Sequence, residues 1–255
     1  MLAYSHDAAA YRLVERWRAL GEDAVVVTGA DLSRRGWRFV AGDPGATRIA
    51  VGERVVAGSE VRAIVIRMPM MSDGEIAHVH VEDRAYAASE MQAFLLAWTS
   101  SLSCTIVNQP TTCNLGGPAW HPAEWVRRAR RLGLAACSYV VRSTAAEPAG
   151  GELRVDANAK FVDVVGRRAF AVGGRAPLPA DDPAAGLALA LARDAEVEML
   201  RVYYELEDSG APRFVEAGMW IDLDNDAIAE ALTERCFGYV HASAQLAATA
   251  KVVHA

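Results

Sequence analysis

Residues 103–141 read SCTIVNQPTTCNLGGPAWHPAEWVRRARRLGLAACSYVV, and this stretch decides the fold of the 255-residue chain. It predicts a short apolar strand over 104–107 and a second strand over 136–141. Between them we expect a helix that begins at Pro122, because proline lacks an N–H group and fits the first helical turn. The helix is expected to end at Gly133, because glycine suits a left-handed C-cap. This order is typical of α/β proteins, in which ligands bind where a strand ends.

The residues before this stretch predict an open α/β sheet with helices. A strand over 2–4, a helix capped by Asp7 and a buried strand over 24–27 form one βαβ unit. Short alternating segments within 37–56 predict an antiparallel meander. A long helix is expected over 84–100, where apolar residues recur at helical spacing.

The residues after it predict a smaller α+β lobe. A hairpin is expected over 161–172 and a second one over 199–217, each with a glycine at its turn. Helices are expected over 181–193 and 226–241. The fold class is therefore α/β, with domains at 1–142 and 143–255.

Composition and charge exclude several classes of protein. The net charge is −6 and there is no block of lysine or arginine, which argues against a nucleic-acid surface. No apolar run approaches the ~20 residues that a membrane span needs, and the start of the chain has no signal-peptide pattern. We therefore expect a cytoplasmic protein with reduced cysteines, of which Cys113, in a glycine-rich loop, is the one to test for reactivity.

Three short motifs carry a resemblance to a known family: Arg67-Met68-Pro69, Val107-Asn108-Gln109-Pro110 and Leu132-Gly133-Leu134. In this order and spacing the chain resembles the ATP-grasp superfamily, and within it the ribosomal-peptide maturases and glutathione-synthetase-like ligases. The resemblance implies a pre-ATP-grasp N-terminal domain over 1–142 and a truncated ATP-grasp-like domain over 143–255.

The resemblance also implies where a metal would bind. In active relatives the last hairpin carries an acid on its first strand and a Glu-x-Asn motif on its second. This chain keeps Glu216 but has Gly218 in place of the asparagine, and Glu205 or Asp222 is the nearest second carboxylate.

The chain departs from the family between Ser143 and Lys160. Relatives have a lid subdomain there, with lysines and a glycine-rich loop over the nucleotide phosphates, whereas this segment is short, and Lys160 and Lys251 are the only lysines. Those groups bind the triphosphate and stabilise charge in phosphoryl transfer.

Two hypotheses follow. The first is a degenerate, lidless ATP-grasp-like protein that acts as a binding or accessory component in a peptide or natural-product pathway. The second is an ATP- and Mg²⁺-dependent carboxylate–amine or peptide ligase, with a lid supplied by a partner or with arginines in place of lysines. Either way, the cleft residues are expected to be the following: Arg67, Asn108, Cys113, His121, Glu124, Arg142, Lys160 and Glu216.

Simpler interpretations remain open for these residues. Asn108 can satisfy a turn, His121 can lie at a helix N-terminus, and Glu216 can pair with Arg213. A weaker idea pairs Cys113 with His121 as nucleophile and base. The expected partner is a peptide or protein, and a homodimer is suggested by Trp120, Trp125 and the apolar tail at 246–250.

Overall fold

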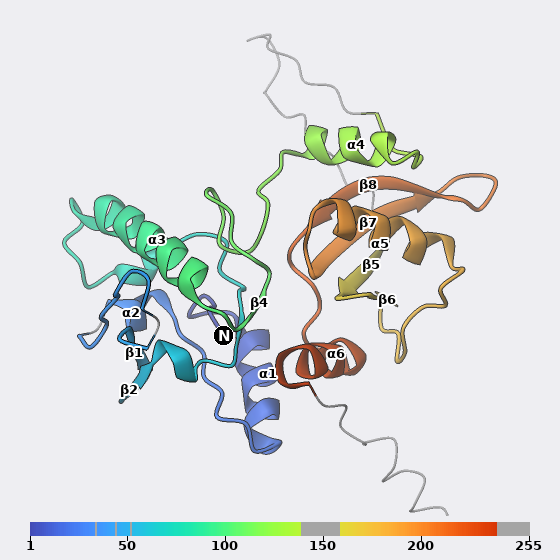
Figure 1. Cartoon of the computed structure of the whole chain (residues 1–255). Coiled ribbons are helices and arrows are strands. Elements are labelled where there is room, and N and C mark those ends of the chain that lie inside the picture. Colours follow the sequence, from blue (N-terminus) through green and yellow to red (C-terminus); the bar gives the residue numbers. More distant parts are fainter. Residues whose placement is uncertain (34, 44, 52, 139–158, 239–255) are drawn as a thin grey trace, which may run out of the picture.

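The chain folds into two lobes that lie side by side (Figure 1). The structure is a computed structural model that describes residues 1–238 except 34, 44, 52 and 139–158. Its helices are α1 (Ala8–Ala19), α2 (Gly29–Leu32), α3 (Arg84–Ser101), α4 (Pro122–Arg131), α5 (Pro183–Asp194) and α6 (Asp226–Phe237), with 3₁₀ turns at Gly58–Glu60 and Asp73–Ile76. Its strands are β1 (Arg48–Val51), β2 (Arg54–Ala57), β3 (Ala63–Val65), β4 (Thr105–Val107), β5 (Lys160–Val165), β6 (Arg168–Ala171), β7 (Met199–Leu206) and β8 (Pro212–Gly218).

The first lobe is built on a small parallel sheet. β3 pairs with β4 in parallel, and Leu2 forms parallel bridges to Ile66 and to Val27. The antiparallel β1–β2 hairpin and α3 pack on one face of this sheet, where Leu2, Ile49 and Leu95 share a core. The predicted strands over 2–4 and 24–27 are therefore reduced to single parallel bridges, and the predicted meander is the β1–β2 hairpin with a bridge from Arg38 to Arg48.

The second lobe is a four-stranded antiparallel sheet in the order β6-β5-β7-β8. One face carries Val162, Val164, Leu200 and Val202, which pack against α5 and α4 in a single apolar cluster. Ala136 bridges in parallel to Phe214, so the chain that follows α4 runs along β8. Both predicted hairpins are confirmed.

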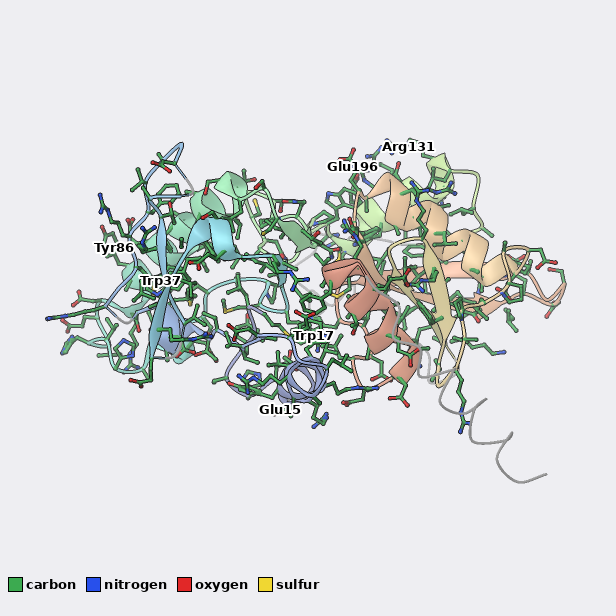
Figure 2. All side chains as sticks on the ribbon, turned by 60° about the horizontal axis from the view of Figure 1, so that its bottom comes forward. Glu15, Trp17, Trp37, Tyr86, Arg131 and Glu196 are labelled. Carbon is green, nitrogen blue, oxygen red and sulfur yellow. The ribbon has the colours of Figure 1, made fainter. Side chains whose placement is uncertain are left out.

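A third apolar cluster joins the two lobes. α6 places Ile228 and Leu232 against Leu13 and Trp17 of α1, together with residues of β3, β4 and β7. The indole N–H of Trp17 donates to the hydroxyl of Thr233 at 2.8 Å, and Figure 2 shows Trp17 where the lobes meet. The lobes therefore share part of one core.

Local signals explain most helix ends. The carboxylate of Asp7 accepts the Ala10 N–H at the start of α1, and α4 begins at Pro122, as predicted. Gly133 has φ +76°, which confirms the left-handed conformation expected there. The closing helix ends at Phe237 rather than at residue 241, because Gly238 adopts φ +77° and caps it.

The packing of α4 bears on the domain division. We expected the first domain to reach residue 142, but Trp125, Val126 and Ala129 of α4 belong to the core of the second lobe. The chain thus crosses between lobes before Pro122, and we propose a boundary between β4 and α4. No helix of the described residues is long and apolar enough to cross a membrane.

Candidate functional site

One face of the second sheet gathers charged and aromatic side chains. Because strand residues alternate between faces, the face opposite α5 carries Phe161, Asp163, Arg201, Tyr203 and Glu216. We call these five residues the charged face. α6 packs on one end of the same sheet face, at Val165 and Met199 in the shared core.

An ion pair lies at the centre of the charged face. Arg201 donates two hydrogen bonds to Asp163, at 2.6 and 2.7 Å, and these residues lie opposite each other on β7 and β5. The guanidinium also lies 3.9 Å from the ring centroid of Phe161. The second oxygen of Asp163 accepts the Asp222 N–H at 3.0 Å. Both oxygens of Asp163 therefore accept hydrogen bonds, and the bond from Asp222 ties the segment after β8 to β5.

Glu216 is the second carboxylate of the charged face, after Asp163. It lies opposite Tyr203, is half-buried, and has no hydrogen bond or ion pair within the described residues. Burial raises its pKa above the usual value for glutamate. Folding therefore disfavours the ionised form of Glu216 compared with a glutamate in water.

The raised pKa predicts a pH dependence. A carboxyl whose pKa is higher in the folded state costs stability as the pH rises through its range. We expect Glu216→Gln to raise the melting temperature at about pH 7.5 and to lose that advantage near pH 4. Thermal melts of both proteins at the two pH values test this, with Glu207→Gln, at an exposed position of the same hairpin, as the control. An equal effect at both pH values would contradict the role of ionisation.

An aromatic shelf continues the site where the lobes meet. Trp220 is 45% exposed and stacks on Tyr4 with ring centroids 6.5 Å apart, and Tyr4 stacks in turn on His6 at 5.5 Å. The guanidinium of Arg67 lies 4.5 Å from the Trp220 ring centroid. Tyr4, His6 and Trp220 form this shelf, which the first and second lobes build together.

The two other carboxylates expected to bind a metal near the last hairpin accept hydrogen bonds within the chain. Glu205 accepts a hydrogen bond from Arg213 at 2.7 Å, and Asp222 accepts the Asp224 N–H. Within the described ranges no three His, Cys, Asp or Glu side chains come together as a metal-ligand group. Mg²⁺ needs several oxygen ligands, and Glu205, the acid expected beside Glu216, is instead paired with Arg213, so the two carboxylates expected from the resemblance are not arranged as a metal site.

Comparison with known proteins identifies the fold. No family model matches the chain, and no curated protein matches it. Among solved structures, the macrocyclase MdnC from Microcystis aeruginosa MRC, bound with the precursor peptide MdnA, aligns over 93% of this chain and 98% of its own at TM-score 0.68 and 13% identity. The macrocyclase MdnB from the same organism gives TM-score 0.62 and 15% identity over 93% and 98% of the chains. The ATP-grasp ligase PsnB, complexed with minimal precursor, Mg and ADP, gives 0.61 and 13% over 92% and 97%.

This chain has an ATP-grasp-like fold. Two residues that the sequence places in a cleft lie in the core of that fold. Arg67 is paired with buried Asp7 at 2.9 Å and donates to the Ile221 carbonyl. Asn108 is fully buried between the lobes.

The other predicted residues of the ATP-grasp-like fold are spread over its surface. Cys113 is exposed in the loop after β4, and the imidazole of His121 accepts the Ala123 N–H and caps α4. Glu124 pairs with Arg127 and Arg128, and the hydrogen bond from Arg127 is the main cause that lowers its pKa to about 2. Lys160 is exposed at the start of β5. Arg142 lies outside the described residues, as does the tail at 246–250.

The tryptophans expected at a dimer surface pack within the second lobe. Trp125 is 3% exposed, and Trp120 lies edge-on to it with ring centroids 4.7 Å apart. Arg128 covers Trp120 at 3.5 Å from its ring centroid. Trp125 is therefore a core residue and is not available to a second copy of the chain.

Sequence reasoning missed the centre of the site. Asp163 and Arg201 interrupt apolar strands with opposite charges, which is the usual signal of a cross-strand pair. These two charges within apolar strands would have predicted that β5 and β7 pair at Asp163 and Arg201. Trp220 has no comparable signal, because its neighbours on the shelf are more than 200 residues away in the sequence.

Proposed function

We propose that this chain is an accessory protein of peptide modification that binds a peptide or protein partner and has no independent ligase activity. Solved neighbours with this fold are described as bound to precursor peptides. The same proposal takes the protein to be cytoplasmic. It leaves a homodimer as a possible assembly, to be built on a surface other than Trp125.

The observation that carries the proposal is the pairing of carboxylates with arginines around the last hairpin. Arg201 holds both oxygens of Asp163, and Arg213 holds Glu205. A ligase that binds Mg²⁺–ATP needs such carboxylates as metal ligands, and an arginine bound to them competes directly with the metal. Glu216, opposite Tyr203, is left without a partner among the described residues.

The exposed part of the site suits a peptide. The shelf offers flat aromatic area at Trp220, and Tyr203 on β7 and Glu216 on β8 offer one donor and one acceptor. Aromatic side chains of this kind are enriched where proteins contact peptides and other proteins. A peptide laid across both lobes would bury Trp220.

A second candidate function is an ATP-dependent carboxylate–amine or peptide ligase. The free Glu216, with its raised pKa, favours it, because a cation is the partner that would best stabilise this carboxylate. Neighbouring ligases are described as complexed with Mg and ADP. This alternative requires either a partner chain that supplies the lid or arginines in place of lysines to bind the triphosphate.

Calorimetric titration separates the two functions. We expect no heat of binding when Mg²⁺–ATP, ADP or a non-hydrolysable ATP analogue is added up to millimolar concentration. Glu216→Gln should likewise give no heat. Glu207→Gln is the matched control, since Glu207 is exposed on the same hairpin.

The contrary outcome is equally definite. Micromolar binding that needs Mg²⁺, is lost in Glu216→Gln and is kept in Glu207→Gln would overturn the accessory function and support the ligase. Binding that persists in both variants would place the nucleotide away from Glu216.

A further inference from the structure

The charged face contains an open space at Gly218. The strand register arranges this face in two cross-strand rows, which are Phe161–Tyr203–Glu216 and Asp163–Arg201–Gly218. Gly218 has no side chain, and a Cβ atom placed on it would meet no atom of the described residues within 4 Å beyond its chain neighbours. The row of the ion pair therefore ends in an empty space on β8, which we call the Gly218 hollow.

Glu216 borders this hollow. Side chains two residues apart on a strand point to the same face of the sheet, so the Glu216 carboxylate stands next to the space above Gly218. Glu216 is half-buried and has no hydrogen bond or ion pair within the described residues. A carboxylate in this position has lost part of its hydration without gaining a partner, so a cation that enters the hollow stabilises it.

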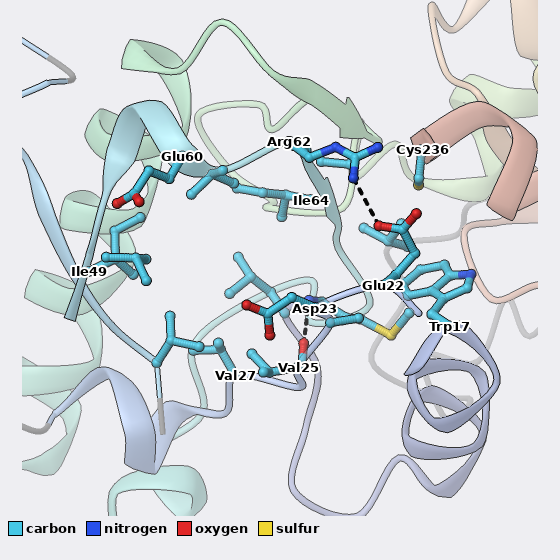
Figure 3. A pocket seen from close by; sticks show the side chains of 18 of the residues that line it. Trp17, Glu22, Asp23, Val25, Val27, Ile49, Glu60, Arg62, Ile64 and Cys236 are labelled. Carbon is cyan, nitrogen blue, oxygen red and sulfur yellow. Dashed lines mark hydrogen bonds and ion pairs between the residues drawn. The ribbon is translucent and has the colours of Figure 1, made fainter. Parts of the chain in front are cut away.

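Carboxylates of the first lobe give a contrast. They line a cavity of about 400 Å³, and Figure 3 shows Glu22 and Arg62 joined in its wall. Arg62 donates to Glu22 at 2.9 Å, and Arg54 donates two hydrogen bonds to Asp23, at 2.8 and 2.9 Å. Those carboxylates have cationic partners within the chain. Glu216 has instead an open space beside it, in which a cation from another molecule fits.

The surroundings of Glu216 suit one positive charge on an apolar stem. The charged face has two carboxylates and one guanidinium, so it carries one negative charge in excess. A divalent metal ion needs several oxygen ligands, which one carboxylate does not supply. The rings of Tyr203 and Phe161, with centroids 5.8 Å apart, continue the row of Glu216 and offer an apolar surface. Lysine and arginine side chains combine a single cationic group with a methylene stem that packs on such surfaces.

We propose that the Gly218 hollow binds a lysine or arginine side chain of the peptide partner, whose cationic group pairs with Glu216 while its methylene stem lies against Tyr203. This inference rests on the function proposed above and adds the kind of side chain that the partner presents. An acidic side chain is repelled at the same place by Glu216.

Selected peptides supply the probe. We select binders from a phage-displayed library of random dodecapeptides on the immobilised full-length protein, and we expect the enriched peptides to share a lysine or arginine at one position. The strongest binder is synthesised as selected and with norleucine at that position, which keeps the methylene stem and removes the charge. Calorimetry should show about five- to thirtyfold weaker binding of the norleucine peptide.

Variants then assign this difference to Glu216 and the hollow. In Glu216→Gln the two peptides should differ by less than about twofold, whereas Glu207→Gln, at an exposed position of the same hairpin, should keep the difference. Gly218→Val fills the hollow with a residue that suits a strand, and it should weaken both peptides alike. In the wild-type protein the carboxyl ¹³C resonance of Glu216 should shift with the basic peptide and much less with the norleucine peptide, a result that does not depend on the folding of any variant.

The outcomes separate this inference from the function on which it rests. If no peptide is enriched, the proposed peptide-binding function fails and the inference fails with it. If peptides bind but norleucine leaves their affinity unchanged, or if the preference for the basic peptide survives Glu216→Gln, peptide binding stands and the inference is overturned. The inference is also overturned if the Glu216 resonance shifts equally with both peptides.

Discussion

Replacing Arg67 by methionine is expected to lower the free energy of unfolding by about 3–5 kcal/mol. The side chains of Arg67 and Asp7 are 5% and 7% exposed, so the variant leaves a buried carboxylate without its counter-charge. It also removes the donor to the Ile221 carbonyl, a bond that joins the two lobes. Urea denaturation at neutral pH measures the loss.

Two further variants test whether the loss comes from the unpaired buried charge. Arg12→Met removes an ion pair with Asp224 whose side chains are 58% and 50% exposed, and it should cost no more than about 1 kcal/mol. Adding Asp7→Asn to Arg67→Met removes the unpaired charge while keeping a side chain that can cap α1, so the double variant should be more stable than Arg67→Met alone. If the single and double variants are equally unstable, the buried charge is not the cause.

Replacing Asn108 by leucine is expected to cost at least about 3 kcal/mol. Its amide nitrogen donates to the carbonyls of Gly116 and Met199, at 3.0 and 2.8 Å. Its oxygen accepts the N–H groups of Glu198 and Met199, at 2.9 and 2.7 Å. Leucine has a similar volume but leaves all four of these backbone bonds unmade in a fully buried position. Denaturant titration measures the change.

Asn108→Asp gives a pH-dependent test of the same contacts. The aspartate keeps an acceptor for the two N–H groups but turns an oxygen toward two carbonyl oxygens, which, with burial, raises the pKa of the new carboxyl. Because a raised folded-state pKa costs stability as the pH rises, the deficit relative to wild type should be larger at about pH 7.5 than at about pH 4.5. A deficit that does not change with pH would show that lost donors alone explain the instability.

Arg67 and Asn108 show how far the sequence predicts the site. Each follows a short apolar run, and in the structure Arg67 lies just after β3 and Asn108 just after β4, but both were expected to line a cleft and are buried instead. Their partners could not be predicted. Asp7 is 60 residues from Arg67, and Met199 is 91 residues from Asn108, so only the assembled fold shows that each side chain is enclosed.

The same contrast between local signals and distant partners applies to the helix ends and to Glu216. Local signals such as Pro122 and Gly133 set the ends of α4, and these are readable because each acts within a few residues. The face on which Glu216 lies follows from the register of β7 and β8, which contains a shift between Tyr203 and Tyr204 that no local pattern announces. A feature built from distant strands therefore has to be seen in the structure.

The shared cluster of α1 and α6 sets an order for folding during synthesis. Leu13 and Trp17 belong to the first helix, but the residues that cover them, Ile228 and Leu232, belong to the last helix described. While the chain emerges from the ribosome, the first lobe has its sheet but keeps part of its apolar surface uncovered until residues 226–237 have been made. The N-terminal half then exposes the apolar side of α1 until α6 covers it.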